Sequence, residues 1–178
     1  MNYCNIKKYD IANGLGIRVS LFVSGCTNHC KECFQPETWD FNYGKLFTED
    51  TKKEIFIELD KPFMEGITIL GGEPFEPRNQ EVLAPFLEEI KIKYPNKSIW
   101  SYSGFTYEEL TAPGSYPNCK YTDDMLKNID ILVDGRFDIN LKNISLQFRG
   151  SSNQRIIDVQ KTRYFNSIIL WDNKYTKK

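Results

Sequence analysis

The sequence has a single histidine, His29, and no excess of either charge, since 23 lysines and arginines face 24 aspartates and glutamates in 178 residues. This balance excludes binding to nucleic acid or an anionic membrane through bulk charge. No apolar run reaches the length of a membrane span, and the N-terminal sequence MNYCNIKKYD lacks the apolar run of a signal peptide. We therefore expect a cytoplasmic protein without nucleic-acid or membrane partners, in which thiols stay reduced.

Five cysteines are present, an odd number that does not suit a disulfide framework. Cys26, Cys30 and Cys33 follow the spacing Cys-x3-Cys-x2-Cys, whereas Cys4 and Cys119 are isolated and are expected to be ordinary thiols. A thiolate, not a thiol, is the metal ligand, and it needs a metal or a positive field to stay deprotonated. The cluster of three therefore favours metal or thiol chemistry.

The length and the 40% share of hydrophobic residues predict one domain with a real core. Two long helical patterns are present: one over 48–60 with Thr48 as N-cap, and one over 79–95 that Asn79 can cap and Pro85 can kink or delay. Two short helical pieces follow, TYEEL and DDMLKN. These alternate with apolar, strand-like segments, at 18–24, 67–70, 97–104, 130–135 and 154–160. The order predicts an α/β fold of parallel strands with helical crossovers, as an open sheet or a partial barrel.

Four of the predicted strands end in polar or glycine-containing segments: Ser24-Gly25-Cys26, Gly71-Gly72-Glu73, Ser101-Tyr102-Ser103-Gly104 and Asp134-Gly135-Arg136. In a parallel sheet these ends lie at the same edge, where α/β folds build their sites. The sequence therefore predicts one pocket along that edge.

Two kinds of metal site remain open for the three cysteines. A structural zinc site needs four protein ligands, and His29 is a poor fourth because it directly precedes Cys30 and should point away from a metal there. An iron–sulfur cubane held by three cysteines leaves one iron open to an exogenous ligand. Phe34 would give that ligand an apolar wall.

The motif Cys26-x3-Cys30-x2-Cys33-Phe34 resembles the signature of radical S-adenosylmethionine enzymes. Further segments are similar to the activating subunit of anaerobic (class III) ribonucleotide reductase: Gly14-x-Gly16-x-Arg18, SLFVSGC, GGEP, SGF, VDGRF and RGSSNQR. The resemblance covers nearly the whole chain. It implies a partial TIM-like (βα) barrel of mostly parallel strands.

The resemblance also implies a ligand set. Cys26, Cys30 and Cys33 would hold a [4Fe-4S] cluster whose open iron binds the methionine part of S-adenosylmethionine. Gly71, Gly72 and Glu73 would lie at the methionyl ammonium, with hydrogen bonds from the last two. The remaining implied cofactor contacts are Glu32, Cys33 and Phe34 at the adenine, and Ser101, Ser103, Asp134 and Arg136 at the ribose and methionine parts.

The implied reaction begins with one electron from a flavodoxin- or ferredoxin-type reductant. It cleaves S-adenosylmethionine to methionine and a 5′-deoxyadenosyl radical, which removes hydrogen from a glycine of the large reductase subunit. The alternatives are an activase for another glycyl-radical enzyme, a small peptide-modifying radical enzyme, and a non-catalytic zinc module.

Other segments carry weaker expectations. Arg18 is a candidate for the substrate side, and Arg149–Arg155 is a donor-rich segment that would contact cofactor or partner. We expect one domain over 1–178, with a core from about 15 to 160 and a C-terminal tail over 161–178. The basic end, Lys174–Lys178, is predicted to be solvated.

Overall fold

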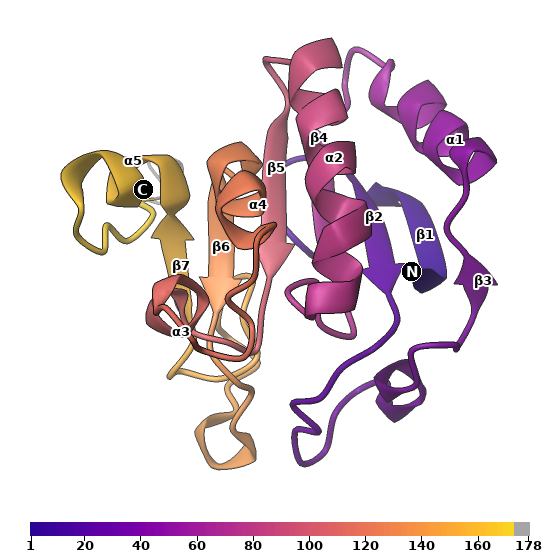
Figure 1. Ribbon diagram of the computed structural model, residues 1–178. Coiled ribbons are helices and arrows are strands. Elements are labelled where there is room, and N and C mark those ends of the chain that lie inside the picture. Colours follow the sequence, from indigo (N-terminus) through magenta and orange to yellow (C-terminus); the bar gives the residue numbers. More distant parts are fainter. Residues whose placement is uncertain (173–178) are drawn as a thin grey trace.

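A computed structural model describes residues 1–172, which form a seven-stranded sheet with helices on one face (Figure 1). The strand order is β3-β1-β2-β4-β5-β6-β7. The strands are β1 (Asn2–Asp10), β2 (Arg18–Val23), β3 (Lys45–Leu46), β4 (Gly66–Gly71), β5 (Ser98–Tyr102), β6 (Ile131–Asp134) and β7 (Arg155–Asp158).

The centre of the sheet is parallel and its two sides are antiparallel. Strands β2, β4, β5 and β6 pair in parallel, with Val19 beside Ile67 and Ile67 beside Ile99. Strands β1, β3 and β7 pair antiparallel with their neighbours. The sheet is open within the described residues, since β3 and β7 are its two edges. The partial-barrel form of the fold stays a prediction.

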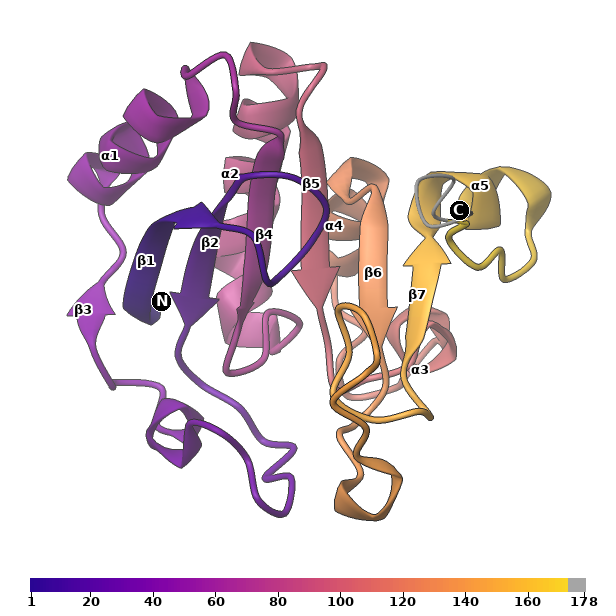
Figure 2. The ribbon, with the colours of Figure 1, turned by 180° about the vertical axis from the view of Figure 1, so that it is seen from behind.

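Two strands differ from the expectation. The sequence analysis misses β1, which pairs antiparallel with β2 (Figure 2). The segment 154–160, expected as the last core strand, forms a strand only over Arg155–Asp158, and this strand runs antiparallel to β6. A parallel strand needs a crossover to the start of its neighbour. Here the chain between β6 and β7 holds a short 3-10 helix, η2 (Ile139–Leu141), and stays at the carboxyl end of the sheet, so the next strand runs back.

Five α-helices lie within the described residues: α1 (Glu49–Leu59), α2 (Pro77–Lys93), α3 (Tyr107–Thr111), α4 (Thr122–Asn128) and α5 (Val159–Phe165). The predicted N-cap Thr48 is confirmed and forms a capping box with Thr51. The predicted cap Asn79 is wrong, since α2 begins at Pro77. A proline at the first helical position has no N–H to lose and a preset φ. Pro85 lies inside α2 and does not end it.

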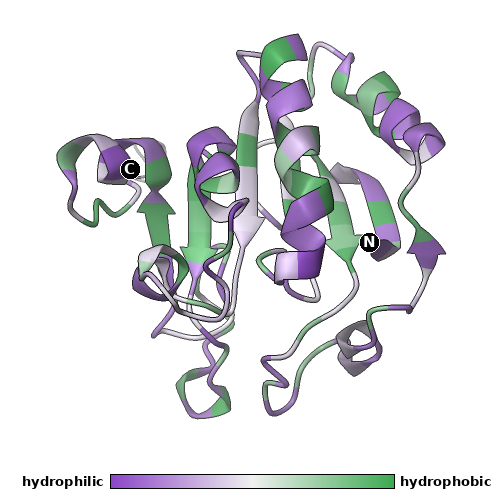
Figure 3. Cartoon of the chain, viewed as in Figure 1, coloured by the Kyte–Doolittle hydropathy of each residue, from purple (hydrophilic) through white to green (hydrophobic). Residues whose placement is uncertain are grey.

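The main core lies between the sheet and helices α1, α2 and α4, which cover one face (Figure 1). Buried side chains such as Leu21 and Ile69 from the strands meet Ile55, Leu83 and Phe86 from the helices. Figure 3 shows the apolar strands behind helices whose outer faces are hydrophilic. Apolar area removed from water stabilises the fold by about 25 cal/mol per Å², so the burial of this layer stabilises the domain.

The opposite face carries a smaller core around Trp100, Ile131 and Val133. Trp171 packs on Trp100 with ring centroids 5.1 Å apart, so part of the predicted tail returns to the sheet after α5. Residues 173–178, which include the whole of the predicted basic end, lie outside the described residues. The domain bounds stay a prediction. Within residues 1–172, no helix combines the length and apolarity needed to cross a membrane.

Candidate functional site

A cavity of about 260 Å³ lies at the carboxyl ends of the four parallel strands. Its position confirms the predicted pocket at that edge of the sheet. The loops that surround it extend beyond the arrowheads of β2, β4, β5 and β6 in Figure 1. The cavity is lined by Cys26, Asn28, Cys30, Cys33, Phe34, Thr38, Trp39, Leu70, Gly71, Gly72, Glu73, Tyr102, Ser103, Gly104, Gly135, Phe137, Gly150 and Gln154.

The loop from Gly25 to Cys33, which we call the cysteine loop, starts directly after β2. Its first residues run beside the 3-10 helix η1 (Pro36–Trp39), because Gly25 N–H donates to the Thr38 carbonyl at 2.7 Å. Gly25 has φ +96°, and a Cβ there would lie 2.3 Å from the Phe41 ring. His29 is exposed and its ring packs against Trp39 at 4.6 Å, so it lies outside the cavity lining, as predicted.

The three cysteine thiols of the loop all face the cavity and are free. Burial, with Glu73 as the second cause, raises the pKa of Cys26 to about 12. Burial also raises the pKa of Cys30, and Cys33 beside it adds to the rise. Within residues 1–172, no three His, Cys, Asp or Glu side chains are gathered closely enough to hold a single metal ion.

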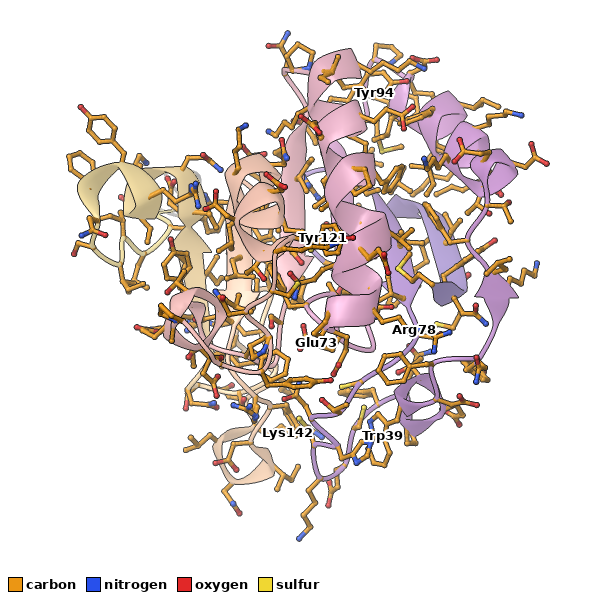
Figure 4. All side chains as sticks on the ribbon, in the orientation of Figure 1. Trp39, Glu73, Arg78, Tyr94, Tyr121 and Lys142 are labelled. Carbon is orange, nitrogen blue, oxygen red and sulfur yellow. The ribbon has the colours of Figure 1, made fainter. Side chains whose placement is uncertain are left out.

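Glu73 is the most connected polar residue of the cavity. Its carboxylate accepts hydrogen bonds from Phe75 N (2.9 Å), Ser103 Oγ (2.9 Å), Gly104 N (2.7 Å) and Asn28 Nδ2 (2.9 Å). Glu73 is buried, and this burial raises the pKa of its carboxyl group to about 7. The hydrogen bonds from Phe75 N and Gly104 N act in the opposite direction and lower the pKa. Figure 4 shows Glu73 above the loops that carry Trp39 and Lys142. Glu73 thus joins the ends of β4 and β5 to the cysteine loop.

Gly71 and Gly72 let the end of β4 approach the cysteine loop closely. Gly72 N–H donates to the Val23 carbonyl and Glu73 N–H to the Gly25 carbonyl, both at 2.8 Å. A Cβ at Gly72 would lie 2.6 Å from the Gly25 carbonyl oxygen. The sequence suggests that these glycines make room for a ligand; the structure shows that they also make room for backbone.

The predicted adenine contacts lie at the mouth of the cavity. Phe34 is 86% exposed and lines the cavity, with Lys142 Nζ 5.9 Å from the centre of its ring. Glu32 is exposed, has φ 58°, and is not part of the lining. The loop therefore brings Cys33 and Phe34 to the cavity but turns Glu32 outward.

Of the residues predicted to contact the ribose and methionine parts, one lines the cavity and the other three do not. Ser103 lines the cavity, whereas Ser101 is buried beneath it and donates to the Tyr102 carbonyl at 3.4 Å. Asp134 is buried and accepts from Tyr107 N at 2.7 Å and from Arg155 Nε at 3.0 Å. Arg136 is exposed and donates to both carboxylate oxygens of Glu109, at 3.0 and 3.1 Å.

Arg18 does not lie on the cavity side, so its assignment to the substrate side is wrong. It is 1% exposed at the amino-terminal start of β2. Its guanidinium donates to Thr68 Oγ1 at 2.8 Å and to the Ile67 and Ser98 carbonyls at 2.7 Å. The residue ties three parallel strands together at the end of the sheet remote from the cysteines.

Several residues of the lining are not among those expected from the sequence, among them Asn28, Thr38, Trp39 and Phe137. Trp39 and Phe137 reach the cavity through loop packing, which no local pattern signals. The donor-rich segment before β7 does contribute: Gly150 and Gln154 line the cavity. Gln154 Nε2 donates to the Gly135 carbonyl at 3.0 Å, which fixes this segment against the end of β6.

Comparison with known proteins adds to this geometry. A family model described as a 4Fe-4S single cluster domain matches residues 12–157. The chain is 37% identical over 156 residues to the anaerobic ribonucleoside-triphosphate reductase-activating protein of Enterobacteria phage T4, covering 88% of this chain and 93% of that protein. The protein of the same name from Haemophilus influenzae is 39% identical over 158 residues, with 88% and 97% covered. The one from Escherichia coli K12 is 36% identical over 156 residues, with 86% and 96% covered.

Proposed function

This chain belongs to the family of anaerobic ribonucleoside-triphosphate reductase-activating proteins, and on that premise we propose that it activates an anaerobic ribonucleotide reductase through an iron–sulfur cluster. The observation that carries the proposal is the set of three free cysteines on one wall of a cavity at the carboxyl edge of the sheet. Three thiolates suit a cluster that keeps one position open for chemistry.

The donor set fits a [4Fe-4S] cluster better than a single zinc ion. Cys26, Cys30 and Cys33 stand on one irregular loop, in which His29 and Glu32 have positive φ. His29 packs on Trp39 and supplies no fourth ligand from within the loop. Burial raises the pKa of these thiols, so they would release protons when the cluster binds. The loop would bring the three sulfurs together around the cluster in the same step.

We propose S-adenosylmethionine as the second cofactor, in the part of the cavity between the cysteines and Glu73. The chemistry that a bound cluster would supply is one-electron reduction of the sulfonium, which would break the sulfur–C5′ bond and give methionine and a carbon radical able to take hydrogen from a glycine of the reductase. Glu73 accepts four hydrogen bonds from this chain, so it would orient the Gly72 segment, and in its ionised form it would attract the methionyl ammonium.

The remaining cofactor roles are proposed from position. Phe34 and Ser103 line the cavity and can contact the cofactor directly. Ser101 and Asp134 lie beneath the strand ends and would shape the floor of the site. Arg136 would have to leave Glu109 to pair the methionine carboxylate. Glu32 would contribute only if the loop turns on binding.

The partner proposed is the glycyl-radical subunit of the reductase, with a flavodoxin- or ferredoxin-type reductant. A glycine on a flexible segment of that subunit would have to reach the cavity, which is lined by the cysteine loop and by Phe137 and Gly150 from the chain between β6 and β7. The cavity walls then position this glycine and keep water away from it. No general acid or base is required by this chemistry.

Anaerobic purification and reconstitution with iron and sulfide test the proposal. We expect a brown protein with about four irons per chain that cleaves S-adenosylmethionine under dithionite. With its reductase it should generate a glycyl radical, which electron paramagnetic resonance detects. A colourless chain with one zinc, still colourless after reconstitution, would falsify the proposal. If the cluster forms but the radical appears only on another glycyl-radical enzyme or on a peptide, the proposed partner is wrong. The proposed cluster chemistry would then still stand.

A further inference from the structure

A second buried carboxylate, Glu76, also holds the cysteine loop. Its Oε1 accepts hydrogen bonds from Thr27 N at 2.7 Å and from Thr27 Oγ1 at 2.6 Å. Its Oε2 accepts from the Tyr116 hydroxyl at 2.7 Å. Glu76 is 0% exposed, although Thr27 itself lies at the surface. An exposed loop residue is thus tied to a buried carboxylate 49 positions away.

Glu76 departs from the usual behaviour of a residue in its place. It is the N-cap of α2, a position where the side chains of Ser, Thr, Asp and Asn commonly accept from the first N–H groups of their own helix. The Glu76 side chain makes no such hydrogen bond. Its backbone carbonyl accepts from Asn79 N at 2.8 Å, while the side chain reaches out of the helix to Thr27. Departures from local rules of this kind concentrate at functional sites.

The two carboxylates hold neighbouring residues of the loop. Glu76 binds Thr27, and Glu73 accepts from Asn28 Nδ2 at 2.9 Å. Both residues lie between Cys26 and Cys30, so their anchors fix the backbone from which those two thiols project. Within residues 1–172, no ion pair includes Glu76. After burial and Glu73, the Glu76 carboxylate is a further cause of the raised pKa of Cys26, which places it near that thiol.

We propose that Glu76 is a positioning residue for the cluster. Through Thr27 it fixes the cysteine loop, and its charge lowers the reduction potential of a cluster bound there. A negative charge in a buried site opposes the addition of an electron, because the surrounding dielectric screens it little. The first part concerns the apoprotein alone; the second rests on the proposed iron–sulfur function.

Three variants separate geometry from charge. In Glu76→Gln the remaining carbonyl oxygen can accept both Thr27 donors, and the Tyr116 hydroxyl can turn to accept from the new amide. In Glu76→Ala the acceptors and the charge are both lost. The matched control is Glu81→Gln, also on α2: Glu81 accepts a tyrosine hydroxyl, from Tyr121 at 3.2 Å, but is exposed and does not contact the cysteine loop.

Hydrogen exchange of the apoprotein tests the hold on the loop. In Glu76→Ala the Thr27 amide should exchange about tenfold or more faster, as expected for the loss of a hydrogen bond to a charged group. Glu76→Gln and Glu81→Gln should stay near the wild type. Equal exchange of Thr27 in the wild type and a folded Glu76→Ala would overturn the positioning role. If Glu76→Ala does not fold, Glu76→Gln decides the matter, because its amide oxygen can still accept from Thr27. Loss of Thr27 protection in that variant would overturn the proposal that a hydrogen bond to residue 76 holds the loop.

Redox titration of the reconstituted proteins tests the charge. The cluster of Glu76→Gln should have a more positive reduction potential than that of the wild type, and that of Glu81→Gln should be unchanged. Equal potentials in Glu76→Gln and the wild type would overturn this part. A wild type that takes up no cluster would defeat the proposed function instead, while the exchange of Thr27 would still decide whether Glu76 holds the loop.

Discussion

Ser103 Oγ donates a 2.9 Å hydrogen bond to Oε1 of Glu73, and this contact joins the end of β5 to the loop after β4. The same hydroxyl accepts from Phe105 N at 3.0 Å. Gly104 N and Asn28 Nδ2 bind the other carboxylate oxygen. One side chain therefore sets the spacing of three segments around the cavity, and its protonation should be measurable in the stability of the fold.

We predict that stability falls as the pH rises through the titration range of Glu73. Its pKa is raised from 4.5 to about 7 in the folded chain. Between these values the folded state holds a proton that the unfolded state has released, so rising pH favours unfolding. This pKa shift corresponds to a loss of about 3 kcal/mol in the free energy of unfolding, and the loss is complete above about pH 7. Urea unfolding of the apoprotein at about pH 5 and about pH 8 measures it.

Glu73→Gln is the matched control for this pH dependence. Glutamine has the same shape and does not titrate, so the difference in unfolding free energy between the two proteins should change with pH by that amount. Other titrating groups are common to both proteins and cancel. Parallel pH profiles would instead mean that the four donors hold the carboxylate ionised throughout.

Gly72→Ala should damage both the fold and the cluster site. The added Cβ would lie 2.6 Å from the Gly25 carbonyl oxygen and 3.0 Å from that of Thr38, and backbone at both places cannot yield easily. We expect a loss of about 1–3 kcal/mol, as for other overpacked positions. Because Gly25 opens the cysteine loop, iron retention should fall as well. Chemical denaturation and iron analysis measure the two effects.

Gly114→Ala is the companion variant. A Cβ at Gly114 meets nothing within 4 Å, although its φ of +80° makes alanine strained. We expect a cost of about 1 kcal/mol or more from that conformation and full retention of iron. If both variants lose iron to the same degree, the close approach at Gly72 is not what shapes the cysteine loop.

The sequence predicts the edge of the sheet that carries the site, because the strand ends can be read from local periodicity. Parallel order then places Cys26, Glu73 and Ser103 at one edge without further information. The side chains that complete the cavity could not be predicted this way. Trp39 and Phe137 depend on how two irregular loops pack, and neither loop has a repeating pattern.

Arg18 and Asp134 show a second limit. Both are charged residues at the ends of apolar strands, which from sequence alone indicates a binding role. The structure pairs each of them internally: Arg18 with three strands, and Asp134 with Arg155. A buried charge needs partners wherever it lies. The sequence shows the charge but not whether its partner is a ligand or another part of the same chain.

Arg155→Met should therefore destabilise the chain through Asp134. The Asp134 side chain is 1% exposed. Without Arg155, this buried carboxylate would keep only the hydrogen bond from Tyr107 N. Breaking a buried ion pair from one side costs about 3–5 kcal/mol, and Arg155 is 31% exposed, so the lower end of that range applies. Thermal and urea unfolding of the apoprotein measure this loss.

Glu108→Gln is the control, because Glu108 pairs with the same guanidinium from the surface. Its side chain is 58% exposed, and exposed pairs contribute about 1 kcal/mol or less. Arg155 lowers the pKa of Glu108 through their hydrogen bond, so this small contribution is lost as the pH falls through that lowered value. Equal effects of the two variants would mean that Asp134 is satisfied without Arg155.

Removing single thiols should separate the cluster ligands from the ordinary cysteines. Cys30→Ala should abolish the cluster, because a site with three thiolates and one open iron has no spare ligand. Cys119→Ala should retain full iron and sulfide, since Cys119 is not part of the cavity lining and its sulfur accepts from Thr122 Oγ1 at 3.7 Å. Iron and sulfide analysis after anaerobic reconstitution decides this. Loss of the cluster in both variants would place a ligand outside the cysteine loop and require another arrangement of the site.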